Sequence, residues 1–162
     1  MPLTIRQINA DRPISGPVRI AIVVARYNQW ITDALVKGAM ETVEKLASNA
    51  SADIIAVPGA FEVVAGAAAA ARSGKFHAIV CLGCIIKGET SHDQHLASSV
   101  TGALADLSAE CGAVGISVGL GVLTVDSAEQ AEARAGGVHG NKGAEAMQAA
   151  LEMVVVLRQT LG

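Results

Sequence analysis

Residues 78–95 read AIVCLGCIIKGETSHDQH and constrain the fold more than any other stretch of this sequence. Residues 78–86 form an unbroken apolar run rich in β-branched side chains, which is typical of a strand covered on both faces. A polar loop, 87–90, follows at once, and a helical pattern then begins in which Ser91 and Gln94 have the spacing of a capping box. The sequence therefore predicts a buried strand that leads through a short loop into a helix.

The predicted helix start after this strand is a candidate anion site. Its first N–H groups have no partner within the helix, and the helix dipole is positive there. His92 lies in the first turn, where an imidazole can transfer protons beside a bound anion, and we interpret it as functional. His95 lies one turn further on. The two histidines could share a metal with Glu89 or Asp93, but this spacing matches no common zinc pattern, and we favour a packing role for His95.

The same alternation of strand and helix recurs along the chain. Apolar runs with β-branched residues predict strands, and the segments after them show helical spacing of apolar residues. The last two helices have start signals of their own: Asp126 with Glu129 as a capping pair, and Gly140 or Asn141. The predicted strands are 19–25, 54–57, 78–86 and 114–122, and the predicted helices are 31–49, 61–73, 91–107, 126–134 and one from 140 or 141 to 157.

A repeated strand–helix order with short loops predicts an α/β fold in which helices cover both faces of a four-stranded parallel sheet. In such sheets the ligand lies at the carboxyl ends of the strands. We therefore expect the site to form where four loops meet, at residues 26–28, 58–62, 87–92 and 123–127.

Residues 1–17 precede the first predicted strand and have no helical pattern. Pro2, Pro13 and Pro17 indicate an extended arm, and Leu3 and Ile5 are apolar residues that could pair with a sheet. Two interpretations remain open: the arm adds a strand to a neighbouring molecule, or it is a frayed terminus. Residues 18–162 are predicted to be one domain.

Composition excludes several classes of function. A net charge of −3 and an aromatic content of 2% argue against nucleic acid and anionic membranes as partners. No apolar run is long enough to span a bilayer and no signal-like segment begins the chain, so we expect a cytoplasmic protein.

Cys81 and Cys84 form a C-x-x-C, but residues three apart on a strand face opposite sides, so we expect two buried thiols rather than a redox pair.

Charged and aromatic residues near the expected loops are further candidates for a binding site. Arg134 and Lys142 flank a glycine-rich turn and are suited to bind phosphate, although ordinary surface charge is an equal alternative. Tyr27 and Phe61 follow strand ends, where they could stack on a planar heterocycle or cap the core. Glu62 stands at a helix start, a position that the dipole alone favours for a carboxylate.

Several blocks of this sequence resemble the 6,7-dimethyl-8-ribityllumazine synthase family. The similarity runs in order from about residue 19 to the C-terminus, and two of its blocks, V-P-G-A-F-E and G-N-K-G, are specific. The matching segments are VPGAFE at 57–62, LGCIIKGETSH at 82–92, GVLT at 121–124, RAG at 134–136, GNKG at 140–143 and LEM at 151–153.

The resemblance implies a transferase in the penultimate step of riboflavin biosynthesis. Members of this family condense 5-amino-6-(D-ribitylamino)uracil with 3,4-dihydroxy-2-butanone 4-phosphate, and they release phosphate and water. No metal and no organic cofactor is expected, so the implied partners are two small-molecule substrates and further copies of the chain. The implied fold is a flavodoxin-like three-layer αβα sandwich, assembled as a pentamer or a multiple of pentamers with active sites between subunits.

The resemblance also implies roles for individual residues. His92 would transfer protons and Tyr27 would stack on the pyrimidine ring, while the loop at Glu89 and Thr90 would bind the ketone phosphate. The ribityl chain would contact Ala60, Phe61 and Glu62, and the ring would contact the backbone of Cys84, Ile85 and Ile86. From the neighbouring subunit, Leu120 would lie over the ring, Arg134 would bind the phosphate and Lys142 would lie near the site.

This sequence departs from the family pattern at four places. Leu120 stands where Phe or Asn is frequent, and Val138 and His139 replace a turn that usually contains a lysine. The acidic residue expected two positions after His92 is displaced to Asp93. Trp30 adds a second aromatic residue close to Tyr27, and either ring could stack on the substrate.

Overall fold

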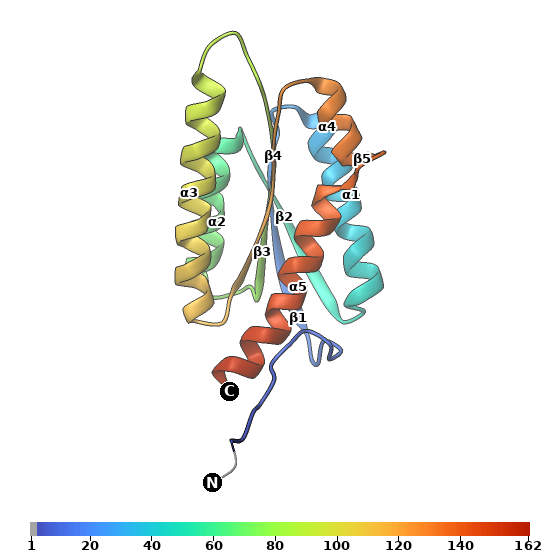
Figure 1. Ribbon diagram of the computed structural model, residues 1–162, viewed down its shortest axis with the longest axis vertical. Helices are drawn as coiled ribbons and strands as arrows, with labels where there is room; N and C mark the ends of the chain where they lie inside the picture. The colour runs from blue at the N-terminus through green and yellow to red at the C-terminus, as the bar shows by residue number, and fades with distance from the viewer. Residues whose placement is uncertain (1–2) are drawn as a thin grey trace.

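A four-stranded parallel sheet forms the centre of the computed structural model, which describes residues 3–162 (Figure 1). The strands are β1 (Val18–Ala25), β2 (Ala50–Val57), β3 (Ala78–Ile86) and β4 (Ser117–Val125). Their spatial order is β2-β1-β3-β4, and every neighbouring pair is parallel. The order places β1 and β3, the two most apolar strands, in the middle of the sheet, where both faces are covered.

Helices cover both faces of this sheet and make a three-layer sandwich. The first face packs against α1 (Gln29–Leu46), α4 (Ala128–Arg134) and α5 (Lys142–Leu161). The second face packs against α2 (Ala60–Arg72) and α3 (His92–Ala113). Figure 1 shows α2 and α3 on one side of the strands and the other three helices on the opposite side. The flavodoxin-like α/β fold predicted from the sequence is confirmed.

Each central strand sends alternate side chains into two separate cores, as the two-residue period of a strand requires. On β1, Ile20 lies in the core under α1 and α5, whereas Ala21 lies in the core under α2 and α3. Cys84 and Cys81 are divided between the same two cores, and both thiols are free and buried. Burial raises the pKa of Cys81 to about 12 and that of Cys84 to about 11. The prediction of two buried thiols is therefore confirmed.

Two strands have boundaries that differ from those predicted. The edge strand β2 was expected only from Ile54, but it begins at Ala50 because it pairs with β1 along its whole length. Its first half is half-buried or exposed, so no apolar run indicates it. The strand β4 was expected over 114–122, but it begins at Ser117, after a turn in which Gly115 has a φ of +85°.

The predicted capping of two helices is wrong in detail. Ser91 is the residue before α3, but its ψ of 5° is far from the extended geometry that caps require, and its side chain accepts no capping bond. The cap of α4 lies one residue later than expected, because the extended Ser127 accepts the N–H of Gln130 at 3.3 Å. By contrast, Asn141 caps α5, as one of the two predicted alternatives states.

The arm has neither helix nor strand in its described part, residues 3–17. Its second half is fastened to α5, where Arg158 donates to the carbonyl oxygens of Ser15 and Pro17, and Gln159 donates to that of Asn9. Leu3 and Ile5 are strongly exposed. The addition of a strand to a neighbouring molecule stays a prediction.

We expect His77 to make the stability of the fold depend on pH. The Nδ1 atom of His77 accepts the backbone N–H of Arg19 at 2.9 Å, a bond that is lost when Nδ1 is protonated. Burial, Arg158 and Arg19 all lower the pKa of His77 below its ordinary value of 6.5. Because the folded state disfavours the charged ring, His77 stabilises the protein above about pH 6.5, and this contribution falls as pH drops through the lowered pKa.

The measurement is the urea midpoint of unfolding between about pH 5 and pH 7.5 for the parent protein and for His77→Asn, whose amide oxygen can replace Nδ1 as acceptor. The variant should lose less stability at acidic pH than the parent. The exposed His139 supplies the matched control, and His139→Asn should follow the parent curve. Parallel curves for the parent and His77→Asn would show that His77 has no such effect.

Candidate active site

A cavity of about 450 Å³ opens at the carboxyl edge of the sheet, on the face covered by α2 and α3. Its walls come from the ends of β1, β2 and β3 and from the first turns of α2 and α3, so three of the four predicted loops contribute to it. The lining residues are Tyr27, Gly59, Ala60, Phe61, Glu62, Cys84, Ile85, Ile86, Gly88, Thr90, His92, Asp93 and Leu96.

Two exposed aromatic rings stand in the wall of this cavity. Tyr27 is 73% exposed and Phe61 is 64% exposed, so neither is a capping residue of the core. Trp30 is half-exposed, but it is not a lining residue. The structure therefore favours Tyr27 over Trp30 as the ring that stacks on a planar ligand.

The loop that contains Tyr27 is held in place by its neighbour Asn28. The side-chain N–H of Asn28 donates to the carbonyl oxygen of Cys84 at 2.9 Å and so connects the end of β1 to the end of β3. Asn28 also adopts a left-handed conformation, with a φ of 57°, which asparagine tolerates better than most residues. A long-range bond of this kind has no local sequence pattern, so sequence reasoning placed Asn28 in an expected site loop without giving it a role.

The segment between β3 and α3 presents polar groups to the cavity. His92 is exposed in the first turn of α3, and its backbone N–H lies 3.4 Å from the hydroxyl of Thr90. The carboxylate of Asp93 lies 3.5 Å from the N–H of Gly88, across the same loop. Asp93, which the sequence analysis named as the displaced acidic residue, therefore lines the cavity beside His92.

Two helix N-termini adjoin the cavity, and neither is capped by a side chain. Gly59, which precedes α2, lines the cavity. Ser91, which precedes α3, lies between the lining residues Thr90 and His92. In the first turn of α3 the N–H of His92 lies 3.4 Å from the Thr90 hydroxyl, and that of Gln94 donates to the carbonyl oxygen of Ser91 at 3.2 Å. The dipoles of both helices favour negative charge at this place. An open pocket with an imidazole, two aromatic rings and two positive helix ends can bind a polar, partly anionic heterocycle.

Four predicted site residues do not line this cavity. Glu89 is exposed in the loop, and Leu120 is 51% exposed on the edge strand β4. Arg134 and Lys142 end α4 and begin α5, on the face of the sheet opposite to α2 and α3 (Figure 1). The helices that carry these two cations thus pack on the other face of the sheet from the helices that wall the cavity.

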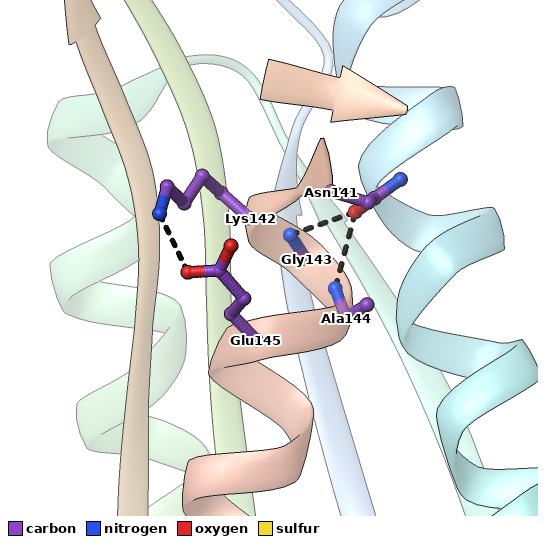
Figure 2. A network of polar contacts seen from close by, with 5 residues as sticks. All are labelled: Asn141, Lys142, Gly143, Ala144 and Glu145. Carbon is purple, nitrogen blue, oxygen red and sulfur yellow. Dashed lines mark hydrogen bonds and ion pairs between the residues drawn. The ribbon is translucent and has the colours of Figure 1, made fainter. Parts of the chain in front are cut away.

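Within residues 3–162, the polar side-chain contacts of Arg134 and Lys142 are local. Arg134 is half-buried, and its guanidinium donates to the carbonyl oxygen of Gln130 at 3.1 Å. Lys142 forms an ion pair with Glu145, one turn along α5 (Figure 2). As far as the described residues 3–162 are concerned, most of the five N–H donors of the guanidinium therefore remain available to a group outside the chain.

Over residues 3–162, no three side chains of His, Cys, Asp or Glu gather in the manner of metal ligands. Over the same residues, no helix combines the length and the apolar character needed to cross a membrane.

The fold and the cavity define a flavodoxin-like α/β protein with an open site at the carboxyl ends of its strands. The family model for 6,7-dimethyl-8-ribityllumazine synthase matches residues 17–158. The chain is also 43% identical, over 159 residues, to the protein from Spinacia oleracea named 6,7-dimethyl-8-ribityllumazine synthase, chloroplastic. That similarity covers 94% of this chain and 70% of the spinach protein.

The chain therefore belongs to the 6,7-dimethyl-8-ribityllumazine synthase family, whose enzymes are transferases of riboflavin biosynthesis. The resemblance noted in the sequence motifs is confirmed over nearly the whole chain. Because the spinach relative is named as chloroplastic, the cytoplasmic location expected from the sequence stays a prediction.

Proposed function

We propose that this protein condenses 5-amino-6-(D-ribitylamino)uracil with 3,4-dihydroxy-2-butanone 4-phosphate to 6,7-dimethyl-8-ribityllumazine. The family supplies the reaction class, and the cavity supplies a matching set of groups. Tyr27 offers a ring for the pyrimidine, and the segment Ala60–Phe61–Glu62 lies where the ribityl chain would extend. No cofactor takes part, because condensation and phosphate elimination require only proton transfer and charge stabilisation.

The observation that supports this proposal most strongly is the position of His92. It stands at an uncapped helix N-terminus, beside Thr90 and within the cavity that Tyr27 and Phe61 line. An imidazole at that place can take and return protons close to a departing anion. This combination suits a reaction that both moves protons and releases phosphate.

The proposed site is shared between subunits. Leu120, Arg134 and Lys142 lie outside the cavity of their own chain, and a second copy could present them to it. Closed rings of identical subunits use such head-to-tail contacts, in which one surface meets a different surface of the next copy. We therefore propose a homopentamer or a multiple of pentamers, with residues 18–162 as the catalytic domain and residues 1–17 as an arm that adds a strand to a neighbour.

In the proposed mechanism, the 5-amino group attacks the ketone and forms an imine with loss of water. A proton leaves the adjacent carbon, phosphate departs from the terminal carbon, and the ribitylamino nitrogen closes the ring with loss of a second water. His92 transfers protons in these steps. Thr90, the start of α3 and Arg134 of the neighbouring copy hold the phosphate while its negative charge develops.

The test is to mix the purified protein with both substrates and to record lumazine absorbance and phosphate release together. We expect the two products to appear in equal amounts, with neither substrate alone giving either product. A protein that binds lumazine but releases no phosphate would be a binder that has kept the fold without catalysis, and the proposal would be wrong. The mass of the particle in solution tests the assembly.

A further inference from the structure

One amide side chain, that of Asn141, joins the start of α5 to the middle of α1. Its oxygen accepts the backbone N–H groups of Gly143 at 2.9 Å and Ala144 at 3.1 Å, and so caps α5. Its nitrogen donates to the carbonyl oxygen of Ala34 at 2.8 Å. Figure 2 shows the two capping bonds and the side-chain nitrogen directed toward α1. The cap is local, whereas the bond to Ala34 spans 107 residues of sequence.

The surface of α1 is shaped to admit this side chain. Gly38 is buried next to Ala34, and a Cβ atom at Gly38 would lie 2.3 Å from Cγ of Asn141. The two helix backbones also touch directly, because a Cβ atom at Gly143 would lie 2.1 Å from the carbonyl oxygen of Leu35. Contacts this close leave no space for α5 to shift while Asn141 keeps its bonds.

The segment that Asn141 fastens is the one that presents both cations. Asn141 pairs with Ala135 in the small antiparallel sheet formed by β5 (Ala135–Gly137) and β6 (Gly140–Asn141). Arg134 directly precedes Ala135, and Lys142 directly follows Asn141. The pair Ala135 and Asn141 therefore sets the separation of the two cations, and the bond to Ala34 sets their position relative to α1.

We propose that Asn141 is a positioning residue for the phosphate-binding cations of the reaction. The bond to Ala34 holds Arg134 and Lys142 at a fixed place on the surface that meets the next copy. The space left by the missing side chain of Gly38, here called the Gly38 notch, makes this bond possible. The inference rests on the proposed function, because it assigns these cations to the ketone phosphate. Asn141 itself touches no substrate.

The main test uses Asn141→Ser, since serine is as good an N-cap as asparagine but is too short to reach Ala34. We expect the KM for the ketone phosphate to rise about tenfold, the effect of losing a bond of roughly 1.4 kcal/mol, while the KM for the aminouracil stays within about twofold. Amide hydrogen exchange over residues 135–140 should accelerate, because the hairpin loses its connection to α1. The matched control is Ser73→Ala, which removes a side-chain bond of 2.7 Å at the far end of α2. It should change neither readout.

A double-mutant cycle tests the notch. Gly38→Ala should raise the KM for the ketone phosphate as Asn141→Ala does, because its Cβ expels the asparagine side chain, although alanine improves helix propensity. Once Asn141 is alanine, the atoms that the new Cβ would meet are gone, so Gly38→Ala should then add no further effect. Effects that multiply would show that the two residues act independently, and the notch would have no role.

Failure of the proposed function and failure of the positioning role of Asn141 give different results. If the parent protein makes no lumazine, the proposed function and this inference both fail. If the parent is active and Asn141→Ser leaves either the phosphate KM or the hairpin exchange unchanged, only the positioning role is overturned.

Discussion

Replacing His92 with alanine is expected to lower kcat by about 10²–10⁴-fold, the usual contribution of a general acid or base. His92 is exposed, lines the cavity and lies at the first residue of α3, so its removal should not disturb the core. The KM values should change little, because proton transfer contributes to the transition state rather than to substrate binding.

Activity should nevertheless remain measurable in His92→Ala. Holding two substrates in the correct orientation can supply about 7–11 kcal/mol, compared with roughly 3–5 kcal/mol from acid–base catalysis. The measurement is the steady-state rate of lumazine formation by an assembly of unchanged mass. The control is His95→Ala. His95 is exposed on α3, so the packing role expected from the sequence is wrong, and it does not line the cavity. This variant should keep the parent rate. Complete loss of activity in His92→Ala with intact assembly would contradict this balance of effects.

Replacing Arg134 with alanine is expected to raise the KM for the ketone phosphate by about ten- to a hundredfold, since a charged hydrogen bond contributes about 1.5–3 kcal/mol. The KM for the aminouracil should stay near its parent value, because the guanidinium is proposed to contact only the phosphate. Arg72→Ala, at the exposed end of α2, serves as the control for loss of a positive charge. An unchanged KM for the ketone phosphate would exclude this role for Arg134.

Mixing the two variants tests whether the site is shared between copies. In a ring, each pocket would take His92 from one subunit and Arg134 from the next. An Arg134→Ala subunit beside a His92→Ala subunit can therefore form a pocket in which both side chains are present. When equal amounts of the two variants are unfolded and reassembled together, about one quarter of the sites should be complete, because neighbours are chosen at random. Activity of the mixture well above that of both variants is the expected result. A mixture that shows only the average of the two would mean that each pocket uses its own chain.

The framework of the site could be predicted from local sequence because burial and periodicity are local properties. The apolar run of β3 indicated a covered strand, and the polar residues after it indicated a loop before a helix, so His92 and Thr90 were placed correctly at the carboxyl edge. The alternation of side chains along a strand likewise predicted the opposite burial of Cys81 and Cys84. Such patterns depend only on the period of the backbone.

The boundaries of the edge strand and the start of α3 were predicted less well. The strand β2 owes its first residues to pairing with β1, which an exposed segment does not encode in its own composition. Ser91 has the residue type of a cap without the backbone conformation of one. In both cases a neighbouring element, rather than intrinsic propensity, determined the local structure.

The sequence by itself determined the alternation of strands and helices, the family, and the chemical groups placed at the strand ends. Only the tertiary structure decided which of those groups share one pocket, because the strand order β2-β1-β3-β4 sets which helices cover each face. It separated Arg134 and Lys142 from His92 by the thickness of the sheet, and it revealed the bonds of Asn28 and Asn141. These bonds join residues far apart in sequence, so their partners are defined only once the helices and strands have packed.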